Sequence, residues 1–278
     1  MSQRDTRSPG AVALVTGASS GIGQACAEEL AHAGLLVFGT SRHPQGAQAD
    51  APIHMLKLDV RDDASAADCV ESVLSQTGRI DVLVNNAGVA LVGALEETAI
   101  DEFKNVLDTN LFGAVRMMRA VLPVMRRQRA GRIVNIGSMM GFLPMPYSSA
   151  YCASKHAILG LSESVDHEVR GFGIRVIAIE PGFIRTDIVR RSPVAAPVEP
   201  YAAARAFPVW DFRRHVEHGA DPALVAHVVV KAATAARPRS LYLPDRYSRF
   251  LHFVREVLPS GCFDFAFRRY FRLDEAAR

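Results

Sequence analysis

The chain lacks most of the features that mark a special class of protein. It has only four cysteines among 278 residues, namely Cys26, Cys69, Cys152 and Cys262. They are widely spaced and form no Cys-x-x-Cys pair, which argues against a zinc site and a disulfide framework and favours a reducing compartment. No run reaches about 18 apolar residues and the first ten residues lack an apolar secretory core. We therefore expect a cytoplasmic protein without a transmembrane segment.

Neither sign of charge predominates. The sequence has 32 basic and 29 acidic residues, a formal net charge of +3, so we expect no binding of nucleic acid. Hydrophobic residues make up 49% of the chain, which is typical of a globular protein with a large core. Because single α/β domains reach this length, we predict one domain over residues 1–278, with a flexible N-terminus at residues 1–10.

Short apolar runs alternate with longer segments of helical period. The expected strands are residues 11–16, 35–40, 53–58, 82–85, 132–137, 175–180 and 240–243. The expected helices are residues 22–33, 64–76, 100–127, 149–170 and 222–235. This alternation predicts a doubly wound α/β fold, a seven-stranded parallel sheet with helices on both faces. Residues 190–208, rich in proline and alanine, interrupt the pattern and are expected to form a mobile insertion.

The first expected strand runs into a glycine-rich turn that opens a helix. Backbone amides and the positive end of that helix would face a pyrophosphate. The spacing of Gly17, Gly21 and Gly23 suits a tight turn, close approach to phosphates and close packing of helix on strand. Alternatively, the glycines serve only the geometry of the turn. The expected cofactor contacts here are Gly17, Ser19, Ser20, Gly21, Ile22 and Gly23.

The second expected strand ends without a carboxylate. An acid about 20 residues after the glycines commonly binds the ribose hydroxyls of NAD(H). Ser41 and Arg42 stand there instead, and a hydroxyl beside a guanidinium suits a 2′-phosphate. The pattern favours NADP(H) over NAD(H), with a solvated surface arginine as the alternative interpretation of Arg42.

Two further strand ends would border the same crevice. Asp59 and Val60 follow the third strand and are placed to meet the adenine, and Asn86, Ala87 and Gly88 follow the fourth. Small residues there let a planar ligand lie against the backbone. An Asn-Asn-Ala-Gly sequence is also simply a good loop.

The sharpest signal is Tyr151-x-x-x-Lys155 on an expected helix, because a spacing of four places both side chains on one face. A phenol has an ordinary pKa of about 10, and a neighbouring ammonium lowers it. Ser138, which follows the fifth strand, could donate a hydrogen bond to a substrate carbonyl or cap a turn. Asn110 lies in an apolar helical stretch and invites either a polar partner or a satisfied buried environment.

Together these segments resemble the short-chain dehydrogenase/reductase family over residues 11–188. Within that family, the sequence as a whole is most similar in character to the retinol and hydroxysteroid dehydrogenases. The resemblance implies a Rossmann-like fold, a dimer or tetramer, and hydride transfer between nicotinamide and a carbonyl or alcohol. It assigns proton transfer to Tyr151, orientation of the oxygen to Ser138, ribose binding to Lys155 and a relay water to Asn110. It adds cofactor contacts at Pro181, Gly182, Ile184 and Thr186.

The expected substrate is a lipid-, retinoid- or steroid-like ketone or alcohol. Residues 189–218 fall where the family carries its variable substrate-binding segment. The expected substrate contacts are Ser138, Leu143, Tyr147, Tyr151 and Trp210. One alternative is a 3-oxoacyl thioester reductase with a basic landing patch at Arg126, Arg127 and Arg129. Another is a non-catalytic, cofactor-binding regulatory protein, against which the intact Tyr151 and Lys155 count.

Residues 246–273 form an extension rich in aromatic residues and arginine. Phe250, Phe253, Val254 and Val257 have helical spacing. The extension could pack on the core or on another subunit, as amphipathic helices commonly do. It could also form a lid or touch a membrane surface.

Overall fold

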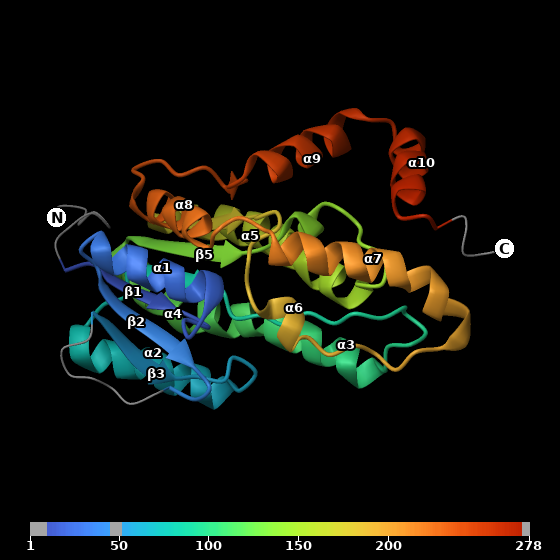
Figure 1. Ribbon diagram of the computed structural model, residues 1–278. Helices are drawn as coiled ribbons and strands as arrows, with labels where there is room; N and C mark the ends of the chain where they lie inside the picture. Colours follow the sequence, from blue (N-terminus) through green and yellow to red (C-terminus); the bar gives the residue numbers. More distant parts are fainter. Residues whose placement is uncertain (1–9, 45–51, 274–278) are drawn as a thin grey trace.

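The computed structural model describes residues 10–44 and 52–273 (Figure 1). Within them, seven parallel strands form one sheet in the order β3-β2-β1-β4-β5-β6-β7. The strands are β1 (Val12–Val15), β2 (Leu36–Ser41), β3 (Ile53–Lys57), β4 (Val82–Asn85), β5 (Gly131–Ile136), β6 (Ile174–Ile179) and β7 (Leu241–Tyr242). The predicted fold class and all seven predicted strands are confirmed. The predicted flexibility of residues 1–10 falls, apart from Gly10, outside the described residues.

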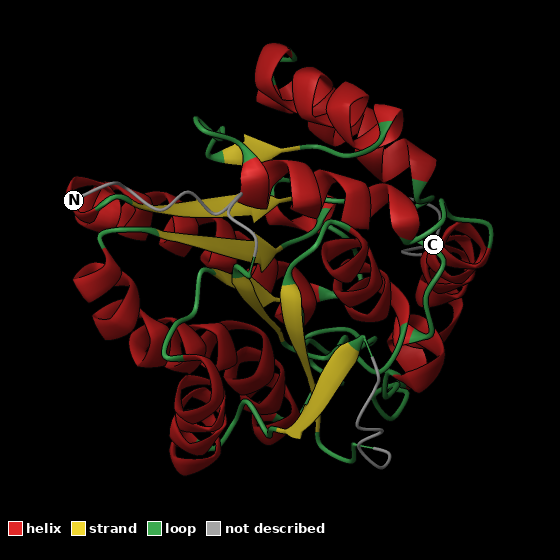
Figure 2. Ribbon diagram, turned by 90° about the vertical axis from the view of Figure 1, so that its left-hand side faces the viewer, coloured by secondary structure: helices red, strands yellow, loops and turns green. Residues whose placement is uncertain are grey.

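Helices cover both faces of the sheet (Figure 2). On one face α1 (Gly21–His32) and α8 (Ala223–Thr234) pack against the strands through an apolar layer. On the other face α2 (Asp63–Thr77), α4 (Gly113–Gln128) and α5 (Ser149–Val169) form a second layer. The central strands β1 and β4 are buried along their whole length and are almost wholly apolar, because both of their faces are covered.

The helix expected over residues 100–127 is not continuous. The chain forms α3 (Ile100–Leu107), a π-helical turn (Asp108–Phe112) and then α4. A π turn adds a residue to the helical repeat and is often found at functional sites. Here the turn contains Asn110, whose side chain is buried.

Residues 190–208, for which we expected a mobile insertion, are largely helical. This segment contains the end of α6 (Ile188–Arg191), a short connection and the first half of α7 (Glu199–Glu217). The buried carboxylate of Glu97 anchors α7, because it accepts hydrogen bonds from the Val198 amide at 2.9 Å and from Arg205 at 2.8 Å. These contacts lie about a hundred residues apart in the chain, so local composition does not show them.

The extension after β7 folds into α9 (Arg246–Val257) and α10 (Ser260–Tyr270). The described chain also has two short 3-10 turns, Met139–Gly141 and Arg170–Phe172. None of the described helices is long and apolar enough to cross a membrane. The inner sides of α9 and α10 join an apolar cluster with Tyr151 and Phe212, so the extension packs on the body of the protein.

A buried ionic cluster joins α5 to β6. Asp166, only 1% exposed, accepts hydrogen bonds from the Val176 amide at 2.9 Å and from Arg175 Nε at 2.8 Å, and it also pairs with Arg170. Removing the Asp166 carboxylate leaves the Val176 amide and the partly buried Arg175 guanidinium without this acceptor. We therefore expect Asp166→Ala to lower the free energy of unfolding by about 3 kcal/mol.

Urea denaturation measures this loss. Glu168→Ala, at an exposed position on the same helix, is the matched control and should change stability by less than about 0.5 kcal/mol. Equal losses in the two variants would contradict the role of the ionic cluster.

Candidate active site

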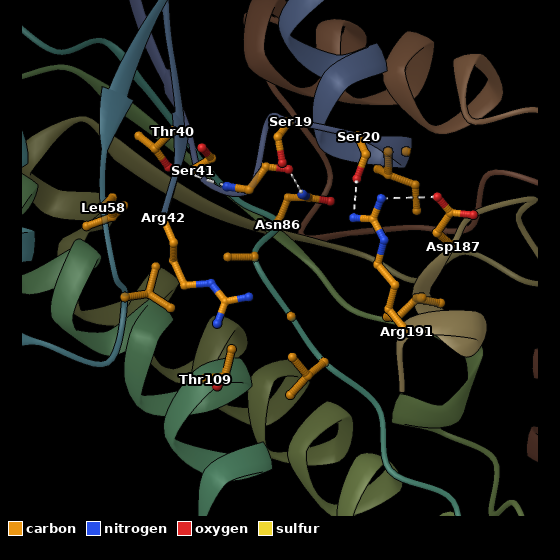
Figure 3. A pocket seen from close by; sticks show the side chains of 18 of the residues that line it. Ser19, Ser20, Thr40, Ser41, Arg42, Leu58, Asn86, Thr109, Asp187 and Arg191 are labelled. Atoms are coloured by element: carbon orange, nitrogen blue, oxygen red, sulfur yellow. Dashed lines mark hydrogen bonds and ion pairs between the residues drawn. The ribbon is translucent and has the colours of Figure 1, made fainter. Parts of the chain in front are cut away.

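A crevice of about 350 Å³ opens at the carboxyl ends of the strands (Figure 3). It brings together thirteen of the residues predicted to contact a cofactor. They are Gly17, Ser19, Ser20, Gly21, Ile22, Ser41, Arg42, Asp59, Val60, Asn86, Ala87, Gly88 and Thr186. This convergence from separate strand ends is the geometry expected of a dinucleotide site in a parallel sheet.

The backbone geometry of the turn requires glycine, and the turn also lines the crevice. Gly17 has a positive φ of 66°, and a Cβ on Gly23 would overlap the Gly17 carbonyl and the Asn86 side chain. The glycines are therefore needed for the turn itself. At the same time, α1 begins with no side-chain cap from Ser20 and no acidic residue in its first turn, so its free amides face the crevice as an anion site.

One end of the crevice fits a phosphate. Ser41 Oγ is buried and has no hydrogen-bond partner among the described residues. The exposed side chain of Arg42 extends from the end of β2 over the crevice beside it (Figure 3). An unpaired hydroxyl and a guanidinium together supply donors for phosphate oxygens.

Asp59 does not offer a free carboxylate to the crevice. Arg61 holds it through Nε at 3.0 Å and through its terminal nitrogen at 2.7 Å. These hydrogen bonds lower the pKa of Asp59 to about 2. The pair lines the crevice at the end where the sequence predicted adenine.

Sequence reasoning missed Arg191, which lines the crevice from the end of α6. Its guanidinium contacts Ser20 Oγ at 3.4 Å and Asp187 at 3.2 Å (Figure 3). Ser20 lies 171 residues earlier in the chain, so no sequence spacing pointed to this contact. Arg191 therefore places a positive charge beside the glycine turn.

A second cavity of about 80 Å³ continues the crevice through the shared residues Ile22, Thr186 and Ile188. It contains five more of the predicted residues: Ser138, Tyr151, Pro181, Gly182 and Ile184. The rest of its lining is largely apolar and includes Met139, Met140, Phe183, Phe212 and Val216. The two hydroxyls thus meet an apolar space at the end of the crevice.

Ser138 and Tyr151 lie together in the lining of this cavity. Ser138 Oγ accepts a hydrogen bond from the Met140 amide at 3.2 Å, so the capping interpretation is correct. Burial raises the pKa of Tyr151, and the nearby Ser138 side chain opposes this only in part. The sequence led us to expect a lowered pKa, but desolvation of the phenolate dominates here.

Lys155 lies one turn after Tyr151, with Nζ 5.5 Å from the centre of the tyrosine ring. Nζ donates a hydrogen bond to the Ile136 carbonyl at 2.9 Å. Burial lowers the pKa of Lys155, because the charged ammonium loses hydration. The pKa of a lysine buried in this way depends strongly on any nearby carboxylate.

The side-chain amide of Asn110 forms hydrogen bonds with protein groups through both its nitrogen and its oxygen. It donates to the Val89 carbonyl and to Ser154 Oγ, both at 2.9 Å, and accepts from the Val89 amide at 2.8 Å. The satisfied-amide interpretation is therefore correct for the side chain. A void of about 10 Å³ lies between Asn110 and Lys155, close to the space that one water needs.

The structure does not bring Leu143, Tyr147 or Trp210 to the apolar cavity, whose lining contains none of them. Leu143 packs in the cluster behind it. Trp210 is 52% exposed and stacks under Arg214. The aromatic residues at 189–218 led us to expect Trp210 in the wall of the substrate pocket. The rotation of α7 about its axis instead brings Phe212 and Val216 to the cavity.

Glu180 is a second residue that sequence reasoning missed. It is completely buried directly after β6, and its Oε2 accepts a hydrogen bond from the Ser138 amide at 2.8 Å. Its other oxygen has no partner among the described residues. A Cβ on Gly137 would overlap the carboxyl group. Burial raises the pKa of Glu180 and the charge of Lys155 lowers it, so the two groups are electrostatically coupled.

Comparison with known proteins agrees with this geometry. A sequence model of the family described as short chain dehydrogenase matches residues 11–195. The chain is 43% identical over 175 residues to a 3-ketodihydrosphingosine reductase of Bacteroides thetaiotaomicron, covering 63% of this chain and 64% of that protein. It is 36% identical over 246 residues to retinol dehydrogenase 8 of Bos taurus, covering 81% and 78%.

Solved structures resemble almost the whole chain. A short-chain dehydrogenase from Streptomyces avermitilis superposes with a TM-score of 0.79 at 33% identity, covering 98% of both chains. A short-chain dehydrogenase/reductase from Burkholderia phymatum, solved with NAD, superposes with a TM-score of 0.76 at 28% identity and covers 92% of this chain and 96% of its own. The extension is thus included in the first match.

The coupling of Glu180 to Lys155 predicts a pH effect. Glu180→Gln keeps an oxygen for the Ser138 amide but removes the negative charge that supports the Lys155 ammonium. The pKa of Lys155 should therefore fall further. We expect the alkaline limb of the kcat/KM profile to move about one pH unit toward acid.

The measurement is kcat/KM against pH for the wild type, for Glu180→Gln and for a control variant, with circular dichroism to establish that each protein is folded. Glu168→Gln is the control, because this exposed carboxylate is not among the charges that shift the pKa of Glu180 or of Lys155. An unshifted limb in a folded and active Glu180→Gln enzyme would show that the coupling has no catalytic effect.

Proposed function

This chain belongs to the short-chain dehydrogenase/reductase family, and we propose that it is an NADP(H)-dependent oxidoreductase that interconverts a ketone and an alcohol on an apolar, lipid-like substrate. The observation that carries the proposal is the meeting of Ser138 and Tyr151 at an apolar cavity continuous with the dinucleotide crevice. Two neighbouring hydroxyls in an apolar pocket suit a polar reacting group on an otherwise apolar molecule.

The nicotinamide supplies hydride exchange when it is bound. In the reductive direction, Ser138 orients the substrate oxygen by donating a hydrogen bond as negative charge develops on it. Tyr151 then delivers its phenolic proton to that oxygen. Because burial raises the pKa of Tyr151, the phenol keeps its proton at neutral pH until the substrate needs it.

Lys155 and Asn110 act behind these two residues. Lys155 keeps a positive charge near the ring of Tyr151, which limits the energetic cost of the phenolate that proton transfer leaves. Its remaining donors suit ribose hydroxyls. Asn110 joins the loop at Val89 to Ser154 on the helix of Tyr151, and with Lys155 it borders a void suited to a relay water.

The preference for NADP(H) rests on Ser41 and Arg42. The unpaired buried hydroxyl of Ser41 and the guanidinium of Arg42 fit a 2′-phosphate, and residues 41–44 at the end of β2 include no carboxylate that could bind a 2′-hydroxyl in its place. The relative solved with NAD makes the preference a point for direct measurement. Arg191 contacts Ser20 at the glycine turn, so it would meet the pyrophosphate that both cofactors share.

The substrate class follows from the cavity lining. Met139, Met140, Phe183 and Phe212 present apolar atoms around the two hydroxyls. The names of both relatives, a ketodihydrosphingosine reductase and a retinol dehydrogenase, refer to lipids. A panel of long-chain ketones, retinoids, steroids and 3-oxoacyl thioesters, followed by nicotinamide absorbance, tests this assignment.

We expect Tyr151→Phe to reduce turnover by about 10²- to 10⁴-fold, because the variant keeps the ring but loses the transferable proton. NADPH binding, measured by fluorescence titration, should persist. Tyr201→Phe is the control, since the exposed Tyr201 hydroxyl contacts only Glu96 among the described residues. Comparable turnover in Tyr151→Phe and the wild type would eliminate Tyr151 as the proton donor.

We expect Arg42→Ala to weaken NADPH binding at least about tenfold and leave NADH binding within about twofold, because a charged hydrogen bond to phosphate contributes about 1.5–3 kcal/mol. Fluorescence titration with both cofactors measures the ratio. Arg191→Ala is the contrast and should weaken both cofactors alike. Equal weakening of NADPH and NADH in Arg42→Ala would refute a 2′-phosphate contact.

A further inference from the structure

The outer side of α9 is apolar and faces solvent. Phe250, Phe253 and Val257 are 60%, 63% and 61% exposed. Their spacing of three and four places them on one side of the helix. Phe265 on α10 is also exposed. Folded domains seldom leave a row of large apolar side chains in water without a binding role.

This exposure does not come from a loosely placed helix. Asp245 caps α9 by accepting the Ser248 amide at 2.7 Å, and its other oxygen accepts the Gly182 amide at 2.8 Å. Leu251 and Val254 pack into the apolar cluster beneath the helix. The inner side of α9 is therefore anchored, and the outer side presents a second apolar surface.

Positive charge surrounds this surface. Exposed arginines lie on both helices, Arg246 and Arg249 on α9 and Arg268 and Arg269 on α10. Residues 246–273 contain six arginines and two acidic residues, whereas the remainder of the chain has 26 basic and 27 acidic residues. The net positive charge of the protein is thus concentrated in the C-terminal helix pair, α9 and α10.

The C-terminal helix pair lies at the periphery of the fold, away from α2 and α3 (Figure 1). Its inner aromatic residues Phe263 and Phe271 belong to the same cluster as Tyr151 and Phe212. The pair therefore has the catalytic region beneath it and the exposed aromatic surface above it.

We propose that the C-terminal helix pair docks the protein on the surface of an anionic phospholipid bilayer, with Phe250, Phe253 and Val257 inserted at the interface and the arginines contacting headgroups. Aromatic and aliphatic side chains flanked by arginine are the composition of interfacial helices, and anionic lipids attract such basic segments. A second copy fits this surface less well, since a symmetric pairing would bring two positive faces together.

Docking would also place the substrate cavity next to the source of an apolar substrate. This link rests on the proposed function, whereas docking itself rests only on the exposed surface. Vesicle binding and cofactor binding are therefore measured separately. A protein that binds vesicles but not NADPH would refute the proposed function and leave docking intact.

The test is co-sedimentation of the full chain with vesicles of equal parts phosphatidylglycerol and phosphatidylcholine, and with phosphatidylcholine alone. We expect binding to the anionic vesicles that weakens with added salt. Phe250→Ser/Phe253→Ser and Arg246→Gln/Arg249→Gln should each lower the partition coefficient at least roughly tenfold. All of these residues are exposed, and unchanged NADPH titration would establish that the variants are folded.

The matched control is Leu95→Ser/Ile100→Ser, which removes two similarly exposed apolar side chains, one in the turn before α3 and one at its first residue, on another part of the surface. It should bind vesicles as the wild type does. Equal binding by both double apolar variants would overturn the proposal. The proposal would also be overturned if the wild type does not bind anionic vesicles. The same holds if light scattering shows that Phe250→Ser/Phe253→Ser dissociates an oligomer while no vesicle binding is found.

Discussion

The side chain of Thr16 joins the two loops between which the crevice opens. Its hydroxyl accepts hydrogen bonds from the backbone amides of Asn86 and Ala87 at 2.9 and 3.0 Å. The side-chain amide of Asn86 donates in turn to the backbone carbonyls of Thr16 and Gly17. These bonds hold the ends of β1 and β4 at a constant separation. Since the strand order reverses between β1 and β4, the crevice is where a dinucleotide can lie.

The second organising constraint is burial at the far end of the crevice. Tyr151, Lys155 and Glu180 all lie in the interior, where charged forms are disfavoured. Burial raises the pKa of the phenol and the carboxyl group and lowers that of the ammonium. The protonation states of these three groups therefore depend on one another in this region, beneath a cavity that is largely apolar.

Local sequence predicted the regular elements well and the connections poorly. The apolar run at residues 82–85 coincides with β4 because a strand buried on both faces must be apolar throughout. No regular helix was predicted at α7 because Pro200 and Pro208 suggest a loop, whereas the Glu97 carboxylate holds the start of the helix through the Val198 amide and Arg205. Trp210 was assigned to the substrate wall on composition, which does not specify how a helix is rotated.

The sequence alone determined the glycine turn and the pairing of Tyr151 with Lys155, because these depend on spacing within one turn or one helix. It also determined the sheet, through the repeated apolar runs. Tertiary structure alone decided that Arg191 reaches Ser20, that Glu180 lies under Ser138 and that the outer side of α9 remains exposed. Such contacts join distant segments, so they depend on how the helices pack on the sheet rather than on any local pattern.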